Sequence, residues 1–232
     1  MRHPTFPLML FAAGLGTRMG ALTANRPKPL IEVAGRPLID HALEIADGAG
    51  VNPIVVNLHY LSGQIRAHLS GRGSVRFSDE TDRILETGGG LRAALPFLGA
   101  GPVITLNTDA VWTGDNPLSA LAQAWDPARM DALLLLVPRE TATGHSGQGD
   151  FDRDAEGRLT RGRSLVYTGA QILNPAALHD IPDAVFSLNR LWDIYDGKGR
   201  LFGLVHGGGW CDVGRPESIA LAERMIAGTA DA

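Results

Sequence analysis

The sequence has one cysteine, Cys211, and very little lysine. A single cysteine excludes an intrachain disulfide and a cysteine-based zinc cluster, so the chain is compatible with a reducing compartment. Lys28 and Lys198 are the only lysines among 21 basic residues, and the others are arginines. The formal net charge is −4, and the sequence has no run of Lys or Arg that would create a local positive patch. Nucleic acid is therefore not an expected partner.

Long apolar runs are also absent. The run nearest the N-terminus, residues 8–13, has six consecutive apolar residues, which is too short for a secretory signal. No other segment approaches the roughly 18 apolar residues of a membrane-spanning helix. We therefore expect a cytoplasmic protein with no membrane partner. Its 232 residues, 44% of them apolar, suffice for one large domain or two small ones.

Short β-type runs alternate with helical patterns over the first 140 residues, which indicates βαβ units. The expected strands cover residues 7–13, 54–58, 75–78, 103–107, 133–138, 166–173 and 201–205. The expected helices cover residues 38–49, 60–69, 90–98, 117–125, 188–195 and 216–227. We predict an α/β fold with a three-layer, Rossmann-like, mostly parallel sheet and helices on both faces. Such sheets bind ligands outside the carboxyl ends of their strands.

The pattern changes beyond about residue 140. Residues 144–149 form a glycine-rich loop, and residues 150–163 resemble a polar hairpin that turns around residues 155–157. No internal repeat or low-complexity linker separates the two parts. We predict one integrated domain over residues 1–232, with a sheet core to about residue 140 and a small β-rich lobe over about 141–232.

A glycine-rich turn follows the first strand directly. Small side chains there let backbone N–H groups approach a phosphate chain: Ala12, Ala13, Gly14 and Gly16, with Thr17 next. The turn is no Walker A loop, because Gly-Lys-Ser/Thr is missing. Met19 stands where a dinucleotide-binding fingerprint needs its third glycine, which disfavours an NAD-dependent oxidoreductase. The alternative is a tight turn that binds nothing.

Arg18 and Lys28 are the cations nearest this turn. Lys28 lies between Pro27 and Pro29, so we expect it on stiff, extended backbone. A compact ammonium suits a phosphate, and the guanidinium of Arg18 can bind two phosphate oxygens at once. The alternative is a solvated lysine in a proline-rich loop. In a chain that otherwise uses arginine, we favour a functional lysine.

These segments together resemble the start of the sugar-1-phosphate nucleotidyltransferases. The resemblance rests on residues 10–19 (LFAAGLGTRM), 26–30 (RPKPL) and 33–38 (VAGRPL). It implies the fold of the nucleotide-diphospho-sugar transferases, in which the glycine-rich turn cradles the base and phosphates. It also implies that Arg18 contacts the β- and γ-phosphates and that Lys28 stabilises charge at the α-phosphate.

Two aspartates are candidate metal ligands. Asp109 follows the apolar run 103–106, and Asp212 lies within residues 210–214 (WCDVG), where a parallel sheet delivers ligands. Mg²⁺ is typically held by one or two carboxylates, with phosphate oxygens and water completing its shell. Each aspartate alone also fits a helix cap or turn, as we interpret Asp115. The resemblance implies that the pair holds Mg²⁺, although Thr108 replaces the family's usual glycine.

A second glycine cluster lies in residues 79–90, where a loop opens a helix. Consecutive glycines there expose N–H groups and admit a ring close to the chain, whereas a flexible helix entry is the alternative. Residues 85–90 (LETGGG) and 145–151 (HSGQGDF) resemble N-acetylmuramate-1-phosphate uridylyltransferases and mannose-1-phosphate guanylyltransferase-like proteins. The resemblance implies a nucleotide site that includes Glu80, Thr87 and Gly88, and a sugar site made of Asn107, Gly149, Asp150, Thr168 and Gly169.

Asp150 and His145 also fit purely structural roles. Asp150 equally fits a hairpin residue, and His145 fits a surface loop. Cys211 has no neighbouring histidine in the sequence that would activate a thiolate, so we assign it to packing.

The sequence thus predicts a Mg²⁺-dependent nucleotidyltransferase. A sugar 1-phosphate attacks the α-phosphate of a nucleoside triphosphate and yields a nucleotide sugar and pyrophosphate. The resemblance favours UTP and N-acetylmuramate 1-phosphate, and hence peptidoglycan recycling. A mannose-1-phosphate guanylyltransferase-like enzyme and a non-catalytic nucleotide-sugar-binding subunit are the alternatives. Monomer and homo-oligomer both stay open.

Overall fold

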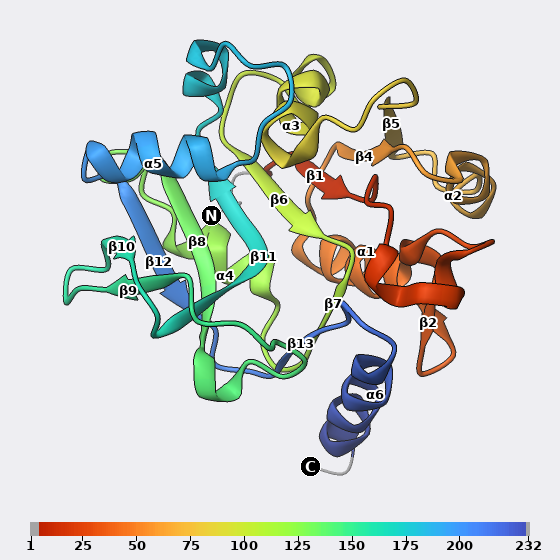
Figure 1. Ribbon diagram of the computed structural model, residues 1–232. Coiled ribbons are helices and arrows are strands. Elements are labelled where there is room, and N and C mark those ends of the chain that lie inside the picture. Colours follow the sequence, from red (N-terminus) through yellow and green to blue (C-terminus); the bar gives the residue numbers. More distant parts are fainter. Residues whose placement is uncertain (1–4, 231–232) are drawn as a thin grey trace.

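A nine-stranded sheet runs through the computed structural model, which describes residues 5–230 (Figure 1). Seven of its strands pair in this order: β5 (Val75–Asp79), β4 (Ile54–Leu58), β1 (Leu8–Phe11), β6 (Val103–Asn107), β11 (Leu165–Leu173), β8 (Ala132–Pro138) and β12 (Leu201–Val205). The first four strands are all parallel, as are β8 and β12. Only β11 runs against its two neighbours on this path. The predicted mostly parallel α/β sheet is confirmed.

Helices cover both faces of the sheet. On one face lie α1 (Leu38–Ala49), α2 (Ser62–His68) and α4 (Pro117–Ala124); on the other lie α3 (Glu86–Leu98) and α5 (Asn189–Gly197). Alternation along β1 explains the division, because successive strand residues point to opposite faces. Leu8 and Leu10 pack in the core beneath α1, whereas Met9 packs in the core beneath α3.

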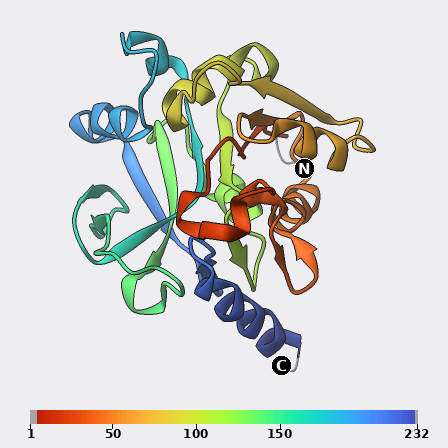
Figure 2. The same ribbon diagram turned by 45° about the vertical axis from the view of Figure 1, so that its right-hand side comes forward.

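Smaller elements surround the carboxyl ends of the strands. Two short ladders are antiparallel: β2 (Glu32–Val33) with β3 (Arg36–Pro37), and β7 (Ala110–Trp112) with β13 (Trp210–Asp212). Three 3-10 segments also lie at this edge: η1 (Thr17–Thr23), η2 (Lys28–Leu30) and η3 (Arg139–Thr141). The fourth, η4 (Ala176–Asp180), follows β11 at the opposite edge of the sheet. The last helix, α6 (Glu217–Ala230), extends from the β7–β13 ladder away from the main sheet (Figures 1 and 2).

The predicted polar hairpin is present as β9 (Phe151–Arg153) and β10 (Leu159–Arg161), which join the edge of the sheet through β11. One irregularity in β11 matters for the site. Its register against β8 shifts between Tyr167 and Gln171, so Thr168 and Gly169 form a bulge beside the end of β6. Bulges of this kind turn side chains toward new neighbours and often occur beside active sites.

Several predicted boundaries are wrong. The first strand ends at Phe11 and the third helix begins at Glu86, four residues earlier than expected. Asp115 does not cap α4, because the side chain of Asn116 accepts the N–H groups of Leu118 and Ser119 instead. Asparagine suits this N-cap position as well as aspartate does, so the sequence alone did not separate the two.

The β7–β13 ladder was not predicted, because runs of three residues carry almost no periodic signal. Its strands nevertheless join segments about 100 residues apart. In the part of the chain that the structure describes, no helix is long and apolar enough to span a membrane. The division into two parts near residue 140 stays a prediction.

Candidate active site

Two adjoining clefts open at the carboxyl ends of the strands. The first has a volume of about 210 Å³, and its walls come from the ends of β1, β4 and β6, from η2 and from the segment between β5 and α3. The second lies between the end of β6, the bulge of β11 and the β7–β13 ladder. Asn107 and Asp109 line both clefts, so the two clefts meet at the end of β6.

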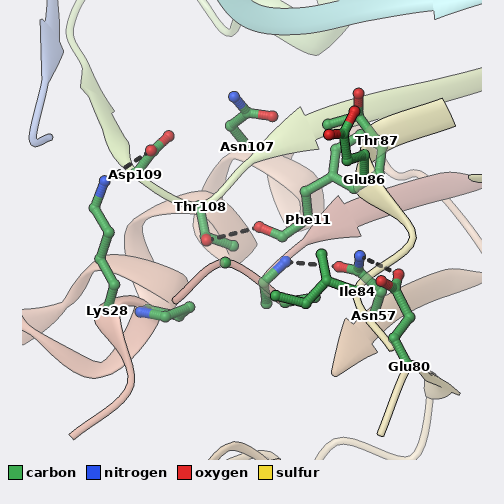
Figure 3. Close-up of a pocket in the computed structure, with 14 residues that line it drawn as sticks. Phe11, Lys28, Asn57, Glu80, Ile84, Glu86, Thr87, Asn107, Thr108 and Asp109 are labelled. Carbon is green, nitrogen blue, oxygen red and sulfur yellow. Dashed lines mark hydrogen bonds and ion pairs between the residues drawn. The ribbon is translucent and has the colours of Figure 1, made fainter. Parts of the chain in front are cut away.

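The first cleft has an ion pair at one end and carboxyl, amide and apolar side chains at the other (Figure 3). Lys28 and Asp109 form the ion pair, while Asn57, Glu80 and Ile84 lie across the cleft from them. The predicted residues Ala12, Ala13, Gly14, Lys28, Glu80, Thr87, Asn107 and Asp109 all line this cleft. The predicted nucleotide side of the site is thus brought together in space.

Lys28 forms an ion pair with Asp109. Its Nζ lies 2.8 Å from Oδ2 of Asp109, and the side chain is 11% exposed. Lys28 begins the 3-10 turn η2, so the expectation of extended backbone at this residue is wrong. Proline is tolerated in the first turn of a helix because its missing N–H is not needed there, which explains how Pro29 follows Lys28. The ammonium is nonetheless fixed in a buried place.

Asp212 faces Asp109 across the short ladder. Asp212 pairs with Ala110, the residue after Asp109, and the N–H of Val213 donates to the Asp109 carbonyl at 2.8 Å. Burial raises the pKa of the Asp212 carboxyl and the charge of Asp109 raises it further, while Lys28 and Arg18 counteract the rise. The structure therefore brings the carboxylates of Asp109 and Asp212 and the cations of Lys28 and Arg18 close together where the two clefts meet.

This donor set fits a divalent metal ion with oxygen preference. Two carboxylates that repel each other gain from a shared cation, and both face a cleft wide enough for a ligand. Residues 5–230 contain no cluster of three or more His, Cys, Asp or Glu side chains with metal-binding geometry. An ion held by Asp109 and Asp212 would take its other ligands from substrate and water, as Mg²⁺ usually does.

Thr108 does not disturb this arrangement. Its hydroxyl donates to the Phe11 carbonyl at 2.8 Å, and its N–H lies 3.3 Å from the same oxygen. Its φ is not positive, so the backbone there does not require the glycine that the family usually has. Thr108 instead ties the end of β6 to the end of β1.

The turn after β1 presents free backbone donors. Within residues 5–230, the N–H groups of Ala13, Gly14, Leu15 and Gly16 have no protein acceptor. Consecutive N–H groups of this kind form an anion-binding concavity. Ala12 differs from the prediction, because its N–H donates to Oδ1 of Asn57 at 2.7 Å and is not free for a ligand.

Asn57 is a site residue that the sequence analysis missed. Its amide nitrogen donates to Oε1 of Glu80 at 2.7 Å, and Oε2 of Glu80 accepts the N–H of Leu85 at 2.9 Å. Glu80 is 3% exposed and has no ion-pair partner among the described residues. The chain from Ala12 through Asn57 to Glu80 therefore fixes the turn against the entry to α3. The sequence did contain a signal for Asn57, because a polar residue in the interior of an apolar strand is unusual.

The glycines at 88–90 pack closely against neighbouring segments. The N–H groups of Gly88 and Gly89 both donate to the Phe186 carbonyl, so the predicted free donor at Gly88 is wrong. A Cβ at Gly88 would overlap the Phe186 ring, and one at Gly89 would overlap the Ala184 carbonyl. The neighbouring Thr87 lines the cleft, and its hydroxyl accepts the N–H of Leu188 at 3.0 Å.

Gly90→Ala is expected to destabilise the protein by about 1 to 3 kcal/mol, the usual cost of overpacking a core. The added Cβ would lie 2.6 Å from Oε1 of Glu80 and would disturb the bond between Glu80 and Asn57. Gly63→Ala in α2 is the matched control, because nothing lies within 4 Å of its Cβ position. Urea unfolding measures both variants. Equal stability of the two would contradict the close contact.

The second cleft collects four of the five predicted sugar-side residues, Asn107, Asp150, Thr168 and Gly169. It is lined by Arg18, Asn107, Asp109, His145, Asp150, Thr168, Gly169, Asp212 and three apolar or aromatic side chains. Several polar groups here already have protein partners. Oδ2 of Asp150 accepts the N–H of Tyr167 at 2.8 Å, and the Thr168 hydroxyl donates to the Leu135 carbonyl at 2.7 Å.

Gly169 has to be glycine. Its φ is +87°, and a Cβ would lie 2.8 Å from the side chain of Asn107. The bulge thus gives Asn107 room between the two clefts.

Four predicted residues do not line either cleft: Gly16, Thr17, Gly88 and Gly149. Gly16 has φ +64° and lets the Lys28 side chain pass close by, since its Cβ would lie 2.9 Å from the Lys28 Cβ. Gly149 packs against the Arg163 and Leu165 carbonyls. These glycines therefore shape the loops that carry site residues.

Cys211 is buried beside Asp212 and packs in the core under α6. Burial raises the pKa of its thiol to about 11, so the thiol is protonated at neutral pH. This agrees with the packing role predicted for it.

Comparison with known proteins places this geometry in a family. The model of the MobA-like NTP transferase domain matches residues 8–146. The chain is 42% identical to the N-acetylmuramate alpha-1-phosphate uridylyltransferase of Caulobacter vibrioides, over 94% of this chain and 96% of that protein. It is 34% identical to the protein of that name in Neisseria meningitidis serogroup B, over 89% and 92% of the two chains.

The fold also matches solved structures. HddC from Yersinia pseudotuberculosis superposes with a TM-score of 0.77, over 96% of this chain and all of the other. The two chains are 23% identical, so this likeness shows the fold alone.

Proposed function

Because the chain belongs to the family of MobA-like NTP transferase domains, we propose that it is a uridylyltransferase that converts UTP and N-acetylmuramate 1-phosphate to UDP-N-acetylmuramate and pyrophosphate. The two uridylyltransferases reported above support the choice of base and sugar. The product would return a cell-wall sugar to its nucleotide-activated form, which is the chemistry of peptidoglycan recycling.

One observation carries the catalytic part of this proposal. The ion pair of Lys28 and Asp109 lies where the two clefts meet, with Asp212 and Arg18 beside it. Nucleotidyl transfer needs in-line positioning and neutralisation of charge on phosphate oxygens, and it needs little covalent help from the protein. A junction of two substrate clefts that holds both cations and carboxylates meets these needs.

The reaction follows from this layout. The nucleotide enters the first cleft with its base toward Asn57 and Glu80 and its phosphates toward the turn at residues 13–16. The sugar 1-phosphate enters the second cleft. One of its phosphate oxygens attacks the α-phosphorus, the bond from that phosphorus to the bridging oxygen breaks, and pyrophosphate leaves. The attacking oxygen is already an anion, so no general base is required.

Three kinds of group would stabilise the transition state. Lys28 neutralises charge that develops on the α-phosphate oxygens. Arg18 and the free N–H groups of the turn bind the leaving pyrophosphate. Asp109 and Asp212 would hold Mg²⁺, which when bound draws phosphate oxygens into line and offsets their charge.

Pyrophosphate release is the direct test. The purified protein should release pyrophosphate fastest with UTP, N-acetylmuramate 1-phosphate and Mg²⁺, and release should stop when Mg²⁺ is chelated. A grid of four nucleoside triphosphates against N-acetylmuramate, N-acetylglucosamine and mannose 1-phosphates fixes the specificity. Preference for GTP with mannose 1-phosphate would replace the uridylyl proposal with the guanylyl alternative. Absence of release with every pair would leave a nucleotide-sugar-binding protein.

A further inference from the structure

Two buried side chains connect opposite walls of the first cleft (Figure 3). The phosphate wall is the turn at residues 12–16, in which the free N–H groups begin at Ala13. The base wall is the segment of residues 84–87, which leads into α3. Asn57 and Glu80 lie between the two walls, and each is 3% exposed. Their hydrogen bonds therefore determine how the two walls stand relative to each other.

Each hydrogen bond between the walls has a fixed direction. The N–H of Ala12 can only donate, so the atom 2.7 Å from it is the Asn57 oxygen, Oδ1. The NH₂ group of Asn57 therefore faces Glu80 and donates to Oε1 at 2.7 Å. Oε2 of Glu80 accepts the N–H of Leu85 at 2.9 Å. A continuous chain of three hydrogen bonds thus joins the phosphate wall to the base wall.

The backbone of Glu80 is bonded within the protein as well. Its N–H donates to the Leu58 carbonyl at 2.8 Å, and its own carbonyl accepts the N–H of Arg83 at 3.1 Å. Nδ1 of His59 lies 2.7 Å from the same carbonyl. Burial of a carboxylate is costly unless its oxygens accept hydrogen bonds, and at Glu80 the protein itself supplies the donors to both oxygens. These are the contacts of a supporting side chain.

We propose that Asn57 and Glu80 are positioning residues for the nucleotide: they hold the two walls in register, and their hydrogen bonds go to the protein rather than to the nucleotide. This assignment rests on the proposed function and replaces the direct binding by Glu80 that the resemblance implied. A nucleotide that contacts both walls binds more tightly when they are already ordered. The same order places the α-phosphorus correctly beside Lys28 and Asp109, because the phosphates follow the turn.

Moving the carboxylate from position 80 to position 57 tests this role. In Glu80→Gln one end of the new amide is an NH₂ group, which faces an N–H donor whichever way the amide is turned. In Asn57→Asp the new carboxylate faces the carboxylate of Glu80. Each single substitution therefore breaks the chain at one bond.

The combined variant Asn57→Asp/Glu80→Gln restores the chain. The introduced aspartate accepts the N–H of Ala12 with one oxygen and the glutamine NH₂ with the other, and the glutamine oxygen accepts the N–H of Leu85. The variant keeps the net charge of the unmodified protein but has no carboxylate at position 80. It therefore separates support of the walls from direct binding of the nucleotide by Glu80.

The measurement is the KM for each substrate in the pyrophosphate assay, at a temperature well below the thermal unfolding of every variant. Each single substitution should raise the KM for UTP about tenfold, as for a buried polar group left without its partner. The KM for the sugar 1-phosphate, which enters the second cleft, should change less than about twofold. In the combined variant the KM for UTP should return to within about threefold of the unmodified protein.

Two further variants control the comparison. Glu156→Gln loses the same charge on the exposed β9–β10 hairpin and should leave both KM values unchanged. A single variant that does not fold is replaced by Glu80→Asp, whose carboxylate is one methylene too short to reach Asn57 and Leu85 together. Glu80→Asp should raise the KM for UTP by a similar factor although it keeps the charge.

Two results would overturn the assignment. A KM for UTP that stays about tenfold raised in the combined variant would show that the nucleotide itself needs the carboxylate at position 80. An unchanged KM for UTP in the folded single variants, with only a lower unfolding temperature, would leave Asn57 and Glu80 with a role in stability alone.

Failure of the proposed function gives a different result. If the unmodified protein prefers another nucleotide and sugar pair, the variants are compared on that pair, because every nucleoside triphosphate has a base and phosphates for the two walls. If no pair turns over, calorimetric titration with UTP replaces KM. The expected order is then the same: weaker binding in the single variants and recovery in the combined variant.

Discussion

Asp109→Asn is expected to lower kcat about a thousandfold, which corresponds to a loss of ~4 kcal/mol of transition-state stabilisation. The amide keeps the shape of the carboxylate but loses its charge, so it no longer draws a divalent cation to the junction of the two clefts. It also removes the anionic partner of Lys28, whose Nζ lies 2.8 Å from Oδ2. Both effects act at the point where the attacking and leaving groups meet.

Asp115→Asn is the matched control for this substitution. Asp115 is exposed, six residues further along the chain, and does not cap α4, so its loss should leave kcat unchanged. Mn²⁺ titration followed by electron paramagnetic resonance supplies a readout separate from turnover. Binding in the presence of UTP should weaken in Asp109→Asn and persist in Asp115→Asn. A near-normal kcat at ordinary Mg²⁺ in Asp109→Asn would remove that residue from the metal site.

The sheet and the phosphate side of the site could be predicted from the sequence. Apolar runs such as 54–58 and 103–107 are long enough to indicate buried strands, and the residues after parallel strands meet at one edge of a sheet. The positions of Ala13, Gly14 and Asp109 follow from that rule. Lys28 was selected because lysine is rare in this chain, and the structure shows it paired with Asp109.

The rest of the site depends on tertiary contacts that no local pattern carries. The three-residue strands β7 and β13 bring Asp109 and Asp212 together, and neither strand has a periodic signature of its own. Asn57 is one polar residue in an apolar strand, and its two partners are distant in sequence. Gly88 lies at a helix N-terminus, where free N–H groups are expected. In the structure the N–H groups of Gly88 and Gly89 instead donate to the Phe186 carbonyl. Partners of this kind become known only once the chain is folded.

Lys28→Met is expected to lower kcat about 100- to 1000-fold, the usual effect of removing one charge-stabilising donor from an active site. Methionine keeps an unbranched stem of similar length, so packing against Gly16 should survive while the charge is lost. The KM for UTP should rise much less than kcat falls, because the charge on the α-phosphate oxygens increases mainly in the transition state. Lys198→Met is the matched control, since Lys198 is the other lysine of the chain and is exposed at the end of α5.

The metal affinity of the same variant tests the role of the ion pair. In the unmodified protein the ammonium of Lys28 occupies Oδ2 of Asp109, so a metal ion and Lys28 compete for that oxygen until a nucleotide gives the ammonium another anionic partner. Without nucleotide, Lys28→Met should therefore bind Mn²⁺ more tightly than the unmodified protein, although it turns over far more slowly. Tighter metal binding together with lower kcat separates loss of the ammonium charge from simple damage to the site, because damage weakens both. A raised KM for UTP with normal kcat would instead assign Lys28 to ground-state binding of the nucleotide.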